Sequence, residues 1–160
     1  MTLDDLREEH WPDVARIYGE GIATGEATFE TELPSWERWT GARLAEHRFV
    51  ALEDGAVTGW VAVGPVSDRC VYDGVVENSV YVAEARRGRG IGRLLLEELI
   101  RSTEAAGIWT IQNGIFPENA SSIRLHEHLG FEVVGRRRRL AQLHGVWRDV
   151  LMLERRSRVV

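Results

Sequence analysis

The chain contains no lysine, and its 160 residues include a single cysteine, Cys70. One cysteine excludes a disulfide within the chain, and no cysteine and histidine cluster has the spacing of a zinc site. The absence of lysine excludes Schiff-base catalysis and a lysine-containing P-loop. A bound anion must therefore rely on arginine side chains and backbone N–H groups, and we expect no metal.

Long apolar runs are also missing. No apolar stretch approaches the roughly 20 residues that span a bilayer, and the N-terminal residues 1–13 are acidic and unlike a signal peptide. The net charge of −5 argues against a general nucleic-acid-binding protein. We therefore expect a cytoplasmic protein that binds neither membranes nor nucleic acid.

Helical and extended patterns alternate along the whole chain, which predicts one domain over residues 1–160. The predicted order is βααβββαβαββ, an α/β (α+β) domain with a mixed, mostly antiparallel sheet flanked by helices. Helices are predicted at residues 11–24, directly after the N-cap candidate Ser35, after residue 90, and from a second N-cap candidate, Asn119, to Gly130. The strands are predicted at the N-terminus and at residues 48–54, 56–64, 75–84, 109–116, 131–140 and 146–154.

Three glycines, Gly88, Gly90 and Gly92, stand between a predicted strand and a predicted helix. The first turn of a helix leaves N–H groups unpaired, and glycine lets a ligand approach the backbone, so this stretch is a candidate anion site. Its G-x-G-x-G spacing fits neither the dinucleotide fingerprint nor the P-loop. Spacing alone leaves a second interpretation open, a glycine-rich turn that binds nothing.

Two motifs in this order resemble those of the GCN5-related N-acetyltransferases, the GNAT family. The stretch Arg87–Gly92 resembles the family's pyrophosphate loop, [Q/R]-x-x-G-x-[G/A]. A second block, Asn119, Ser122, Leu125, Gly130 and Phe131, resembles its N-x-x-[S/A]-x-x-L-x-x-x-x-G-F helix. Residues 17–32, 75–93, 119–131 and 144–150 are similar to the branch that acetylates phosphinothricin and methionine sulfoximine.

The resemblance implies a GNAT fold and acetyl-coenzyme A as co-substrate. It implies that the backbone of Val80, Tyr81 and Val82 pairs with the pantetheine arm. The implied contacts to the rest of the cofactor are Arg87, Gly88, Arg89, Gly90, Ile91, Gly92, Arg93, Asn119 and Ser122.

Acetyl transfer to an amine requires a group that removes a proton from the ammonium form. Glu77 interrupts an apolar strand three residues before Val80, where burial would raise its pKa towards the range of a general base. The resemblance implies the same role, whereas a solvated carboxylate at a strand edge is the alternative. Where many family members carry a tyrosine, this chain has His126, which is either a general acid or a packing residue.

An amino-acid acceptor presents a carboxylate that an arginine fork would bind. We expect Arg69 in this role, with Phe29, Glu30 and Tyr72 at the acceptor pocket. The resemblance further implies a homodimer, in which His144 and Trp147 close the pocket.

The run Arg136–Arg139 lies in a predicted strand, where alternate side chains face opposite ways. A solvated strand edge or a subunit contact is therefore favoured over a nucleic-acid site.

Together these features predict an N-acetyltransferase that acts on the α-amine of a small amino-acid-like acceptor by direct attack in a ternary complex. The alternatives are acetylation of a protein N-terminus or a polyamine, and a non-catalytic acyl-coenzyme A sensor.

Overall fold

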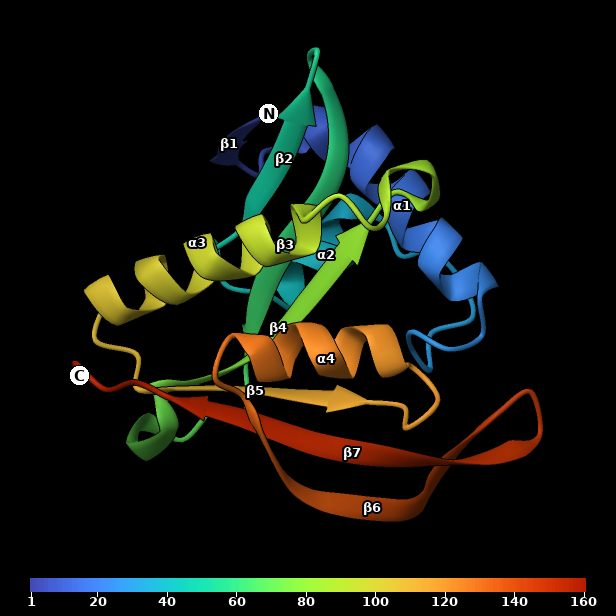
Figure 1. Cartoon of the computed structure of the whole chain (residues 1–160), viewed down its shortest axis with the longest axis vertical. Helices are drawn as coiled ribbons and strands as arrows, with labels where there is room; N and C mark the ends of the chain where they lie inside the picture. The colour runs from blue at the N-terminus through green and yellow to red at the C-terminus, as the bar shows by residue number, and fades with distance from the viewer.

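One sheet of seven strands runs through the molecule in the order β1-β2-β3-β4-β5-β7-β6. The computed structural model describes all residues, 1–160 (Figure 1). Neighbouring strands are antiparallel except β4 and β5, which are parallel. The strands are β1 (Thr2–Asp5), β2 (Phe49–Glu53), β3 (Ala56–Pro65), β4 (Val75–Val82), β5 (Thr110–Ile115), β6 (Glu132–Leu143) and β7 (Val146–Arg156).

Four α-helices flank the sheet, and the order of helices and strands is the predicted βααβββαβαββ. The helices are α1 (Trp11–Ala23), α2 (Trp36–Gly41), α3 (Ile91–Ala105) and α4 (Ala120–His128), with short 3-10 helices at Glu8–His10, Cys70–Tyr72 and Glu84–Arg86. Two predicted N-caps are confirmed, because the side chains of Ser35 and Asn119 accept hydrogen bonds from Arg38 N and Ser122 N. No helix combines the length and the apolar character that a membrane span requires.

The helices divide the core between the two faces of the sheet. Successive residues of a strand point to opposite faces, so Trp60 of β3 joins the cluster formed by α1 and α2, whereas Val61 joins the cluster formed by α3. Trp39 of α2 and Leu95 of α3 are at most 1% exposed in these clusters. The face under α1 and α2 is called the α1 side below, and the face under α3 and α4 is called the α4 side.

The β2–β3 hairpin has the turn that its sequence predicts. Asp54 and Gly55 both have positive φ, 52° and 80°, as a two-residue type I′ turn requires. This turn chemistry matches the right-handed twist of the flanking strands, and it sets Glu53 opposite Ala56; an irregularity between Ala51 and Leu52 then shifts the register by one residue, so that Phe49 stands opposite Val61.

The parallel strands β4 and β5 separate after a short paired region. Only Val75–Glu77 pair with Thr110–Gln112, and beyond Glu77 the two strands run apart (Figure 1). One edge of β4 stays paired with β3 as far as Val82, while its other edge loses its partner strand. This divergence opens the middle of the sheet and positions the site described next.

Candidate active site

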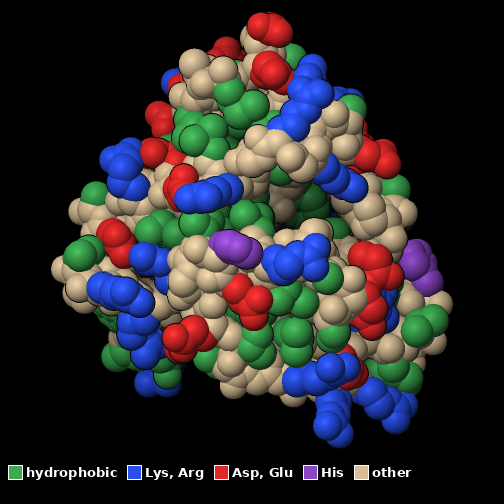
Figure 2. All heavy atoms as spheres, viewed as in Figure 1, with side chains coloured by type: hydrophobic (Ala, Val, Ile, Leu, Met, Phe, Trp, Pro, Cys, Tyr) green, Lys and Arg blue, Asp and Glu red, His purple; other side chains and the backbone are tan.

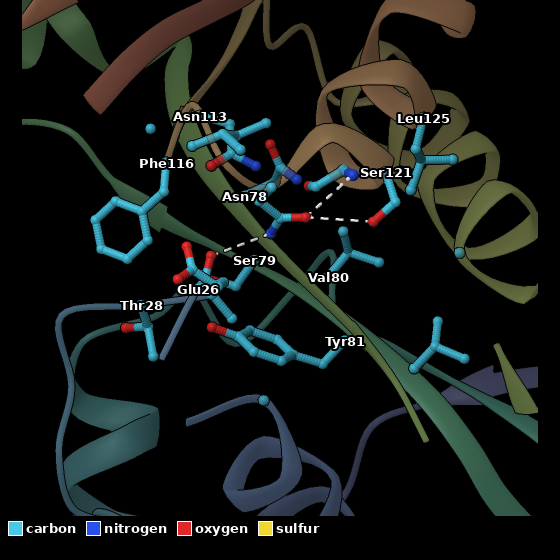
Figure 3. A pocket seen from close by; sticks show the side chains of 18 of the residues that line it. Glu26, Thr28, Asn78, Ser79, Val80, Tyr81, Asn113, Phe116, Ser121 and Leu125 are labelled. Carbon is cyan, nitrogen blue, oxygen red and sulfur yellow. Dashed lines mark hydrogen bonds between the residues drawn. The ribbon is translucent and has the colours of Figure 1, made fainter. Parts of the chain in front are cut away.

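A cavity of about 980 Å³ lies where β4 and β5 diverge. Figure 2 shows the hollow near the centre of one face of the molecule, with arginine side chains around it. It is lined by the strand ends, the loop after α1, the turn before α3, the start of α4, and parts of β6 and β7. In Figure 3, Thr28 and Tyr81 lie on one side of β4, and Ser121 and Leu125 lie on the other. The cavity therefore connects the α1 side of the sheet with the α4 side.

The glycine turn forms one end of the cavity. Gly88 and Gly90 have φ values of 75° and 80°, and Gly90 is the N-cap residue of α3. A Cβ built on either glycine would meet no atom within 4 Å, so open space lies beside this backbone. The first N–H groups of α3 have no acceptor within the helix, and together with the helix dipole they fit a diphosphate.

The arginines around this turn differ in their partners. Arg93 pairs with Glu97 at 2.7 Å, and Arg87 donates from Nε to the carbonyl of Val82 at 3.4 Å. Both line the cavity, as do Gly88, Gly90, Ile91 and Gly92, whereas Arg89 does not. Backbone amides rather than free arginine side chains therefore dominate this end.

The unpaired edge of β4 forms the middle of the cavity. Val80, Tyr81 and Val82 pair with Val61, Trp60 and Gly59 of β3, and they line the cavity where β5 has moved away. The N–H and C=O groups of such an edge can accept an extended ligand as an additional strand. The pantetheine arm of coenzyme A carries two amide groups and fits this requirement.

Glu77 lies at the apex of the divergence, on the last β4 residue that still pairs with β5. Its carboxylate is open to the cavity, but the enclosing walls displace water, and this desolvation raises its pKa above the ordinary glutamate value. Polar interactions with the Gln112 side chain and the Gly114 backbone oppose the increase in pKa. A carboxylate of this kind is suited to accept a proton.

His126 lies on the α4 side of the same apex and is completely buried. Its Nδ1 is 2.7 Å from the carbonyl oxygen of Ser122, which can only accept, so Nδ1 carries the proton. Its Nε2 accepts from the amides of Asn78 at 3.1 Å and Asn113 at 2.9 Å. Burial lowers the pKa of His126, which keeps the ring neutral.

This arrangement gives His126 a bridging position rather than a place in the cavity. Asn78 and Asn113 are the first residues of β4 and β5 beyond the paired region, and Figure 3 shows them close together. His126 does not line the cavity, and its ring nitrogens are both engaged. The geometry favours the packing role that the sequence left open. Asn78 lines the cavity, and its Oδ1 has no partner, so a buried acceptor remains for a ligand N–H group.

Asn119 links the start of α4 to the loop after α1. Its Oδ1 accepts from Ser122 N at 3.3 Å, and its Nδ2 donates to the carbonyl of Glu26 at 3.3 Å. Ser122 lines the cavity and holds the ring of His126 through its carbonyl group. Both residues line the cavity, as do the residues of the glycine turn.

Comparison with known proteins places this geometry in a family. The model of the acetyltransferase (GNAT) family matches residues 3–131. The chain belongs to the GNAT family. The L-methionine sulfoximine/L-methionine sulfone acetyltransferase of Pseudomonas paraeruginosa is 31% identical over 159 residues, which cover 96% of this chain and 92% of that protein.

Solved GNAT structures superpose on nearly the whole chain. A phosphinothricin acetyltransferase from Sinorhizobium meliloti in complex with acetyl-coenzyme A has a TM-score of 0.88 and 32% identity, over 97% of this chain and 87% of that one. A ribosomal-protein-alanine N-acetyltransferase from Brucella melitensis has a TM-score of 0.91 and 31% identity, over 98% and 100%. This chain is therefore an acetyl-coenzyme A-dependent N-acetyltransferase of the phosphinothricin acetyltransferase-like branch.

The α1 side of this GNAT cavity differs from the sequence expectation. Phe29 lines the cavity, where its ring packs edge-on against Phe116 at 4.9 Å. Glu30, Arg69 and Tyr72 do not line it. Arg69 and Tyr72 belong to the exposed loop before β4, where the guanidinium of Arg69 lies 5.7 Å from the Tyr72 ring centroid.

The position of that loop explains the difference. It precedes Val75, at the end of β4 that is still paired with β5, whereas the cavity opens beyond Glu77 at the other end. Arg69 is close to Glu77 in sequence but lies past the closed end of the divergence. Likewise Trp147 is 48% exposed and, together with His144, lies outside the cavity lining.

Sequence reasoning missed several residues of the GNAT cavity that come from β6, β7 and the loops. Arg148 of β7 donates from Nη2 to Glu26 at 2.6 Å and Glu118 at 3.3 Å, and from Nη1 to the carbonyl of Gly25 at 2.9 Å. It thereby fixes the loop after α1, which carries Phe29, against β7. Arg148 does not itself line the cavity, whereas Arg137 and Leu140 of β6 do, although the arginine run gave no sign of it.

Proposed function

We propose that this GNAT enzyme transfers the acetyl group to the α-amine of a small amino-acid-like acceptor, with Glu77 as the general base. The observation that carries the proposal is the Glu77 carboxylate, which faces the cavity at the apex of the divergence and has a raised pKa. Glu77 lies on β4 itself, a short distance before the free edge of that strand that we assign to the pantetheine arm. The relatives named for methionine sulfone and phosphinothricin support an acceptor of this size.

Acetyl-coenzyme A supplies an acyl group activated as a thioester. Glu77 takes a proton from the acceptor ammonium, directly or through a water molecule, and leaves a neutral amine. The amine nitrogen forms a bond to the carbonyl carbon and loses its extra proton to solvent, the carbon–sulfur bond breaks, and the sulfur departs as a thiolate that takes a proton from solvent. A backbone N–H group of the β4 edge stabilises the negative charge on the oxygen.

We assign His126 a positioning role in this mechanism. Its Nδ1 proton is engaged by the Ser122 carbonyl, and its Nε2 is an acceptor for two amides. It therefore has no proton that points into the cavity. Its bridge between Asn78 and Asn113 would hold β4 and β5 at the separation that the pantetheine arm requires.

A thiol-release assay with acetyl-coenzyme A tests the proposal. The acceptors are phosphinothricin, methionine sulfoximine, methionine sulfone, the twenty amino acids, a polyamine and a peptide with N-terminal alanine. We expect turnover on compact amino acids and its collapse in Glu77→Gln, with cofactor binding unchanged. Turnover on the peptide or polyamine alone would show that the acceptor is one of these rather than a small amino acid. Cofactor binding without any turnover would indicate a sensor.

The enzyme is also proposed to act as a homodimer through β6. This strand lies at the edge of the sheet, and Val133 and Val134 are 45% and 56% exposed on it. An unpaired edge with apolar side chains favours association with a second copy. Sedimentation equilibrium checks this assignment.

A further inference from the structure

The four arginines of the run 136–139 have separate surroundings in the structure. Arg136 binds Asp149 from Nε at 2.9 Å and from Nη2 at 2.8 Å. The guanidinium of Arg139 lies 4.9 Å from the Trp147 ring centroid. All four arginines are exposed, and Arg137 alone among them lines the cavity.

A β-bulge in β6 separates these side chains. Arg137 pairs with Val150 and Ala141 pairs with Arg148, so three residues of β6 stand opposite the single residue Asp149. Asp149 stabilises the bulge, because it accepts from the backbone N–H of Arg139 at 2.9 Å and from the Arg136 side chain. Arg139 adopts a φ of 48°, a conformation rare outside glycine. The bulge brings Leu140 to the cavity beside Arg137.

Strand register places Arg137 on the same face of the sheet as Glu77. Directly paired residues point to the same face, and so do residues two or four apart in one strand. Glu77 pairs with Gln112, and Gln112 pairs with Glu154 of β7. Val150 lies four residues before Glu154 and pairs with Arg137. Arg137 therefore shares the α1 side with the carboxylate that we propose as the base.

The surroundings of Arg137 are apolar and contain no counter-ion. Val150, the residue that pairs with Arg137, packs with Phe116 and Met152, and all three line the cavity, as does Leu140. Arg137 forms no ion pair in the structure, whereas Arg86 and Arg93, which also line the cavity, pair with Glu53 and Glu97. An unpaired guanidinium beside an apolar wall can bind an anionic group bidentately while the wall contacts a short side chain.

We infer that Arg137 binds an anionic group of the acceptor. The enzyme therefore prefers amine acceptors that carry an anionic group over amine acceptors that lack one. The inference rests on the proposed function and gives it a specificity-determining residue. The anion is either the α-carboxylate or an acidic group on the acceptor side chain. Both present the paired oxygens that a guanidinium fork recognises.

The experiment compares acceptors that have the anionic groups with acceptors that lack them. Methionine sulfone, its carboxamide and phosphinothricin are assayed at saturating acetyl-coenzyme A with wild type, Arg137→Gln, Arg137→Lys and two control variants. Arg138→Gln is the matched control, because it removes the adjacent charge outside the cavity. Arg69→Gln tests the arginine that the sequence favoured.

For the wild type we expect kcat/KM on the free acid to exceed that on the carboxamide by about tenfold or more, the size of one charge-assisted interaction. Arg137→Gln should bring this ratio close to one, because only kcat/KM on the free acid should fall. Arg137→Lys should keep part of the preference for the free acid. Both controls should keep the ratio. An effect confined to phosphinothricin would assign Arg137 to the side-chain anion.

The outcomes distinguish the two proposals. If wild type prefers the free acid, and Arg137→Gln keeps that preference and also keeps kcat/KM on phosphinothricin, the inference on Arg137 is wrong while the amino-acid acetyltransferase stands. If Arg69→Gln abolishes the preference instead, the sequence expectation was right. If none of these acceptors is acetylated, the proposed function itself has failed.

Discussion

The α4 side and the α1 side of the cavity are built by different means. The α4 side presents backbone groups from consecutive residues, the glycine turn and the first turn of α3, at the end of β4. The α1 side presents side chains from distant segments, Phe29, Phe116, Arg137 and Val150. A constant ligand such as a cofactor suits a site made of backbone, whereas a site made of side chains can vary with the acceptor.

Glu77 is where the two sides meet, and its removal has the largest expected effect. Loss of a general base costs about 10²- to 10⁴-fold in rate, so Glu77→Gln should lower kcat by at least about 100-fold while the KM for acetyl-coenzyme A stays within about twofold. Steady-state kinetics in both substrates measure this. Equal losses in cofactor affinity and kcat would show that Glu77 supports the α4 side as well.

The pH profile sharpens the same test. Because desolvation raises the pKa of Glu77, the basic form is populated only above that raised pKa, and kcat should fall on its acidic side at a pH above the ordinary glutamate pKa. Glu77→Gln should lack this acidic limb. A raised folded-state pKa also means that ionised Glu77 destabilises the fold as the pH rises, so the variant should melt no lower than wild type at pH 8.

The difference between the two sides also explains what the sequence could predict. Gly88, Gly90 and the residues of α3 are adjacent in the chain, so their turn and helix start follow from local chemistry alone. Asn119 was likewise recognisable as an N-cap. The helix and strand order followed from apolar periodicity, because each element buries one face against the sheet.

The α1 side depends on how far the strands pair and on where they bulge, and the periodicity of apolar residues predicts neither. Arg69 was expected at the cavity because it is near Glu77 in sequence, but the paired end of β4 and β5 separates them. The arginine run was expected at a solvated strand edge or a subunit contact, and the bulge that brings Leu140 to the cavity with Arg137 depends on Asp149, in the next strand. Pairing extent and bulges are tertiary properties, so neither residue could be placed from the chain alone.

Substitution of His126 tests whether this side chain acts as a structural bridge between β4 and β5. It has the second-largest expected effect. His126→Ala leaves the buried amides of Asn78 and Asn113 without their acceptor, which should lower the free energy of unfolding by about 2–4 kcal/mol. His126→Gln, which offers a carbonyl acceptor, should recover part of this loss. The folded fraction should retain kcat within about tenfold, since a lost general acid would cost about 100-fold or more.

The pH dependence of stability gives a second measure of His126. Its folded-state pKa is lowered by burial, so its contribution to stability is present above the unfolded histidine pKa of about 6.5 and is lost as the pH falls. Between pH 8 and pH 5.5 the melting temperature of wild type should therefore fall more than that of His126→Gln. Parallel curves would mean that His126 has the same pKa in the folded and the unfolded chain, which would contradict a neutral ring held by burial.

Gly90→Ala tests the α4 side alone and has the smallest expected effect. Both Gly90 and Gly107 have φ of 80°, and a Cβ on either would meet no atom within 4 Å, but only Gly90 lines the cavity. Alanine in this left-handed conformation should cost each variant about 1–2 kcal/mol of stability. Only Gly90→Ala should raise the KM for acetyl-coenzyme A, by about tenfold, because its methyl group enters the space beside the α3 amides. The acid-to-carboxamide preference should stay intact in both variants, since the acceptor anion is bound on the other side of the sheet. A loss of that preference in Gly90→Ala would show that the two sides of the cavity are not independent. The assignment of the cofactor to backbone groups and of the acceptor to side chains would then be wrong.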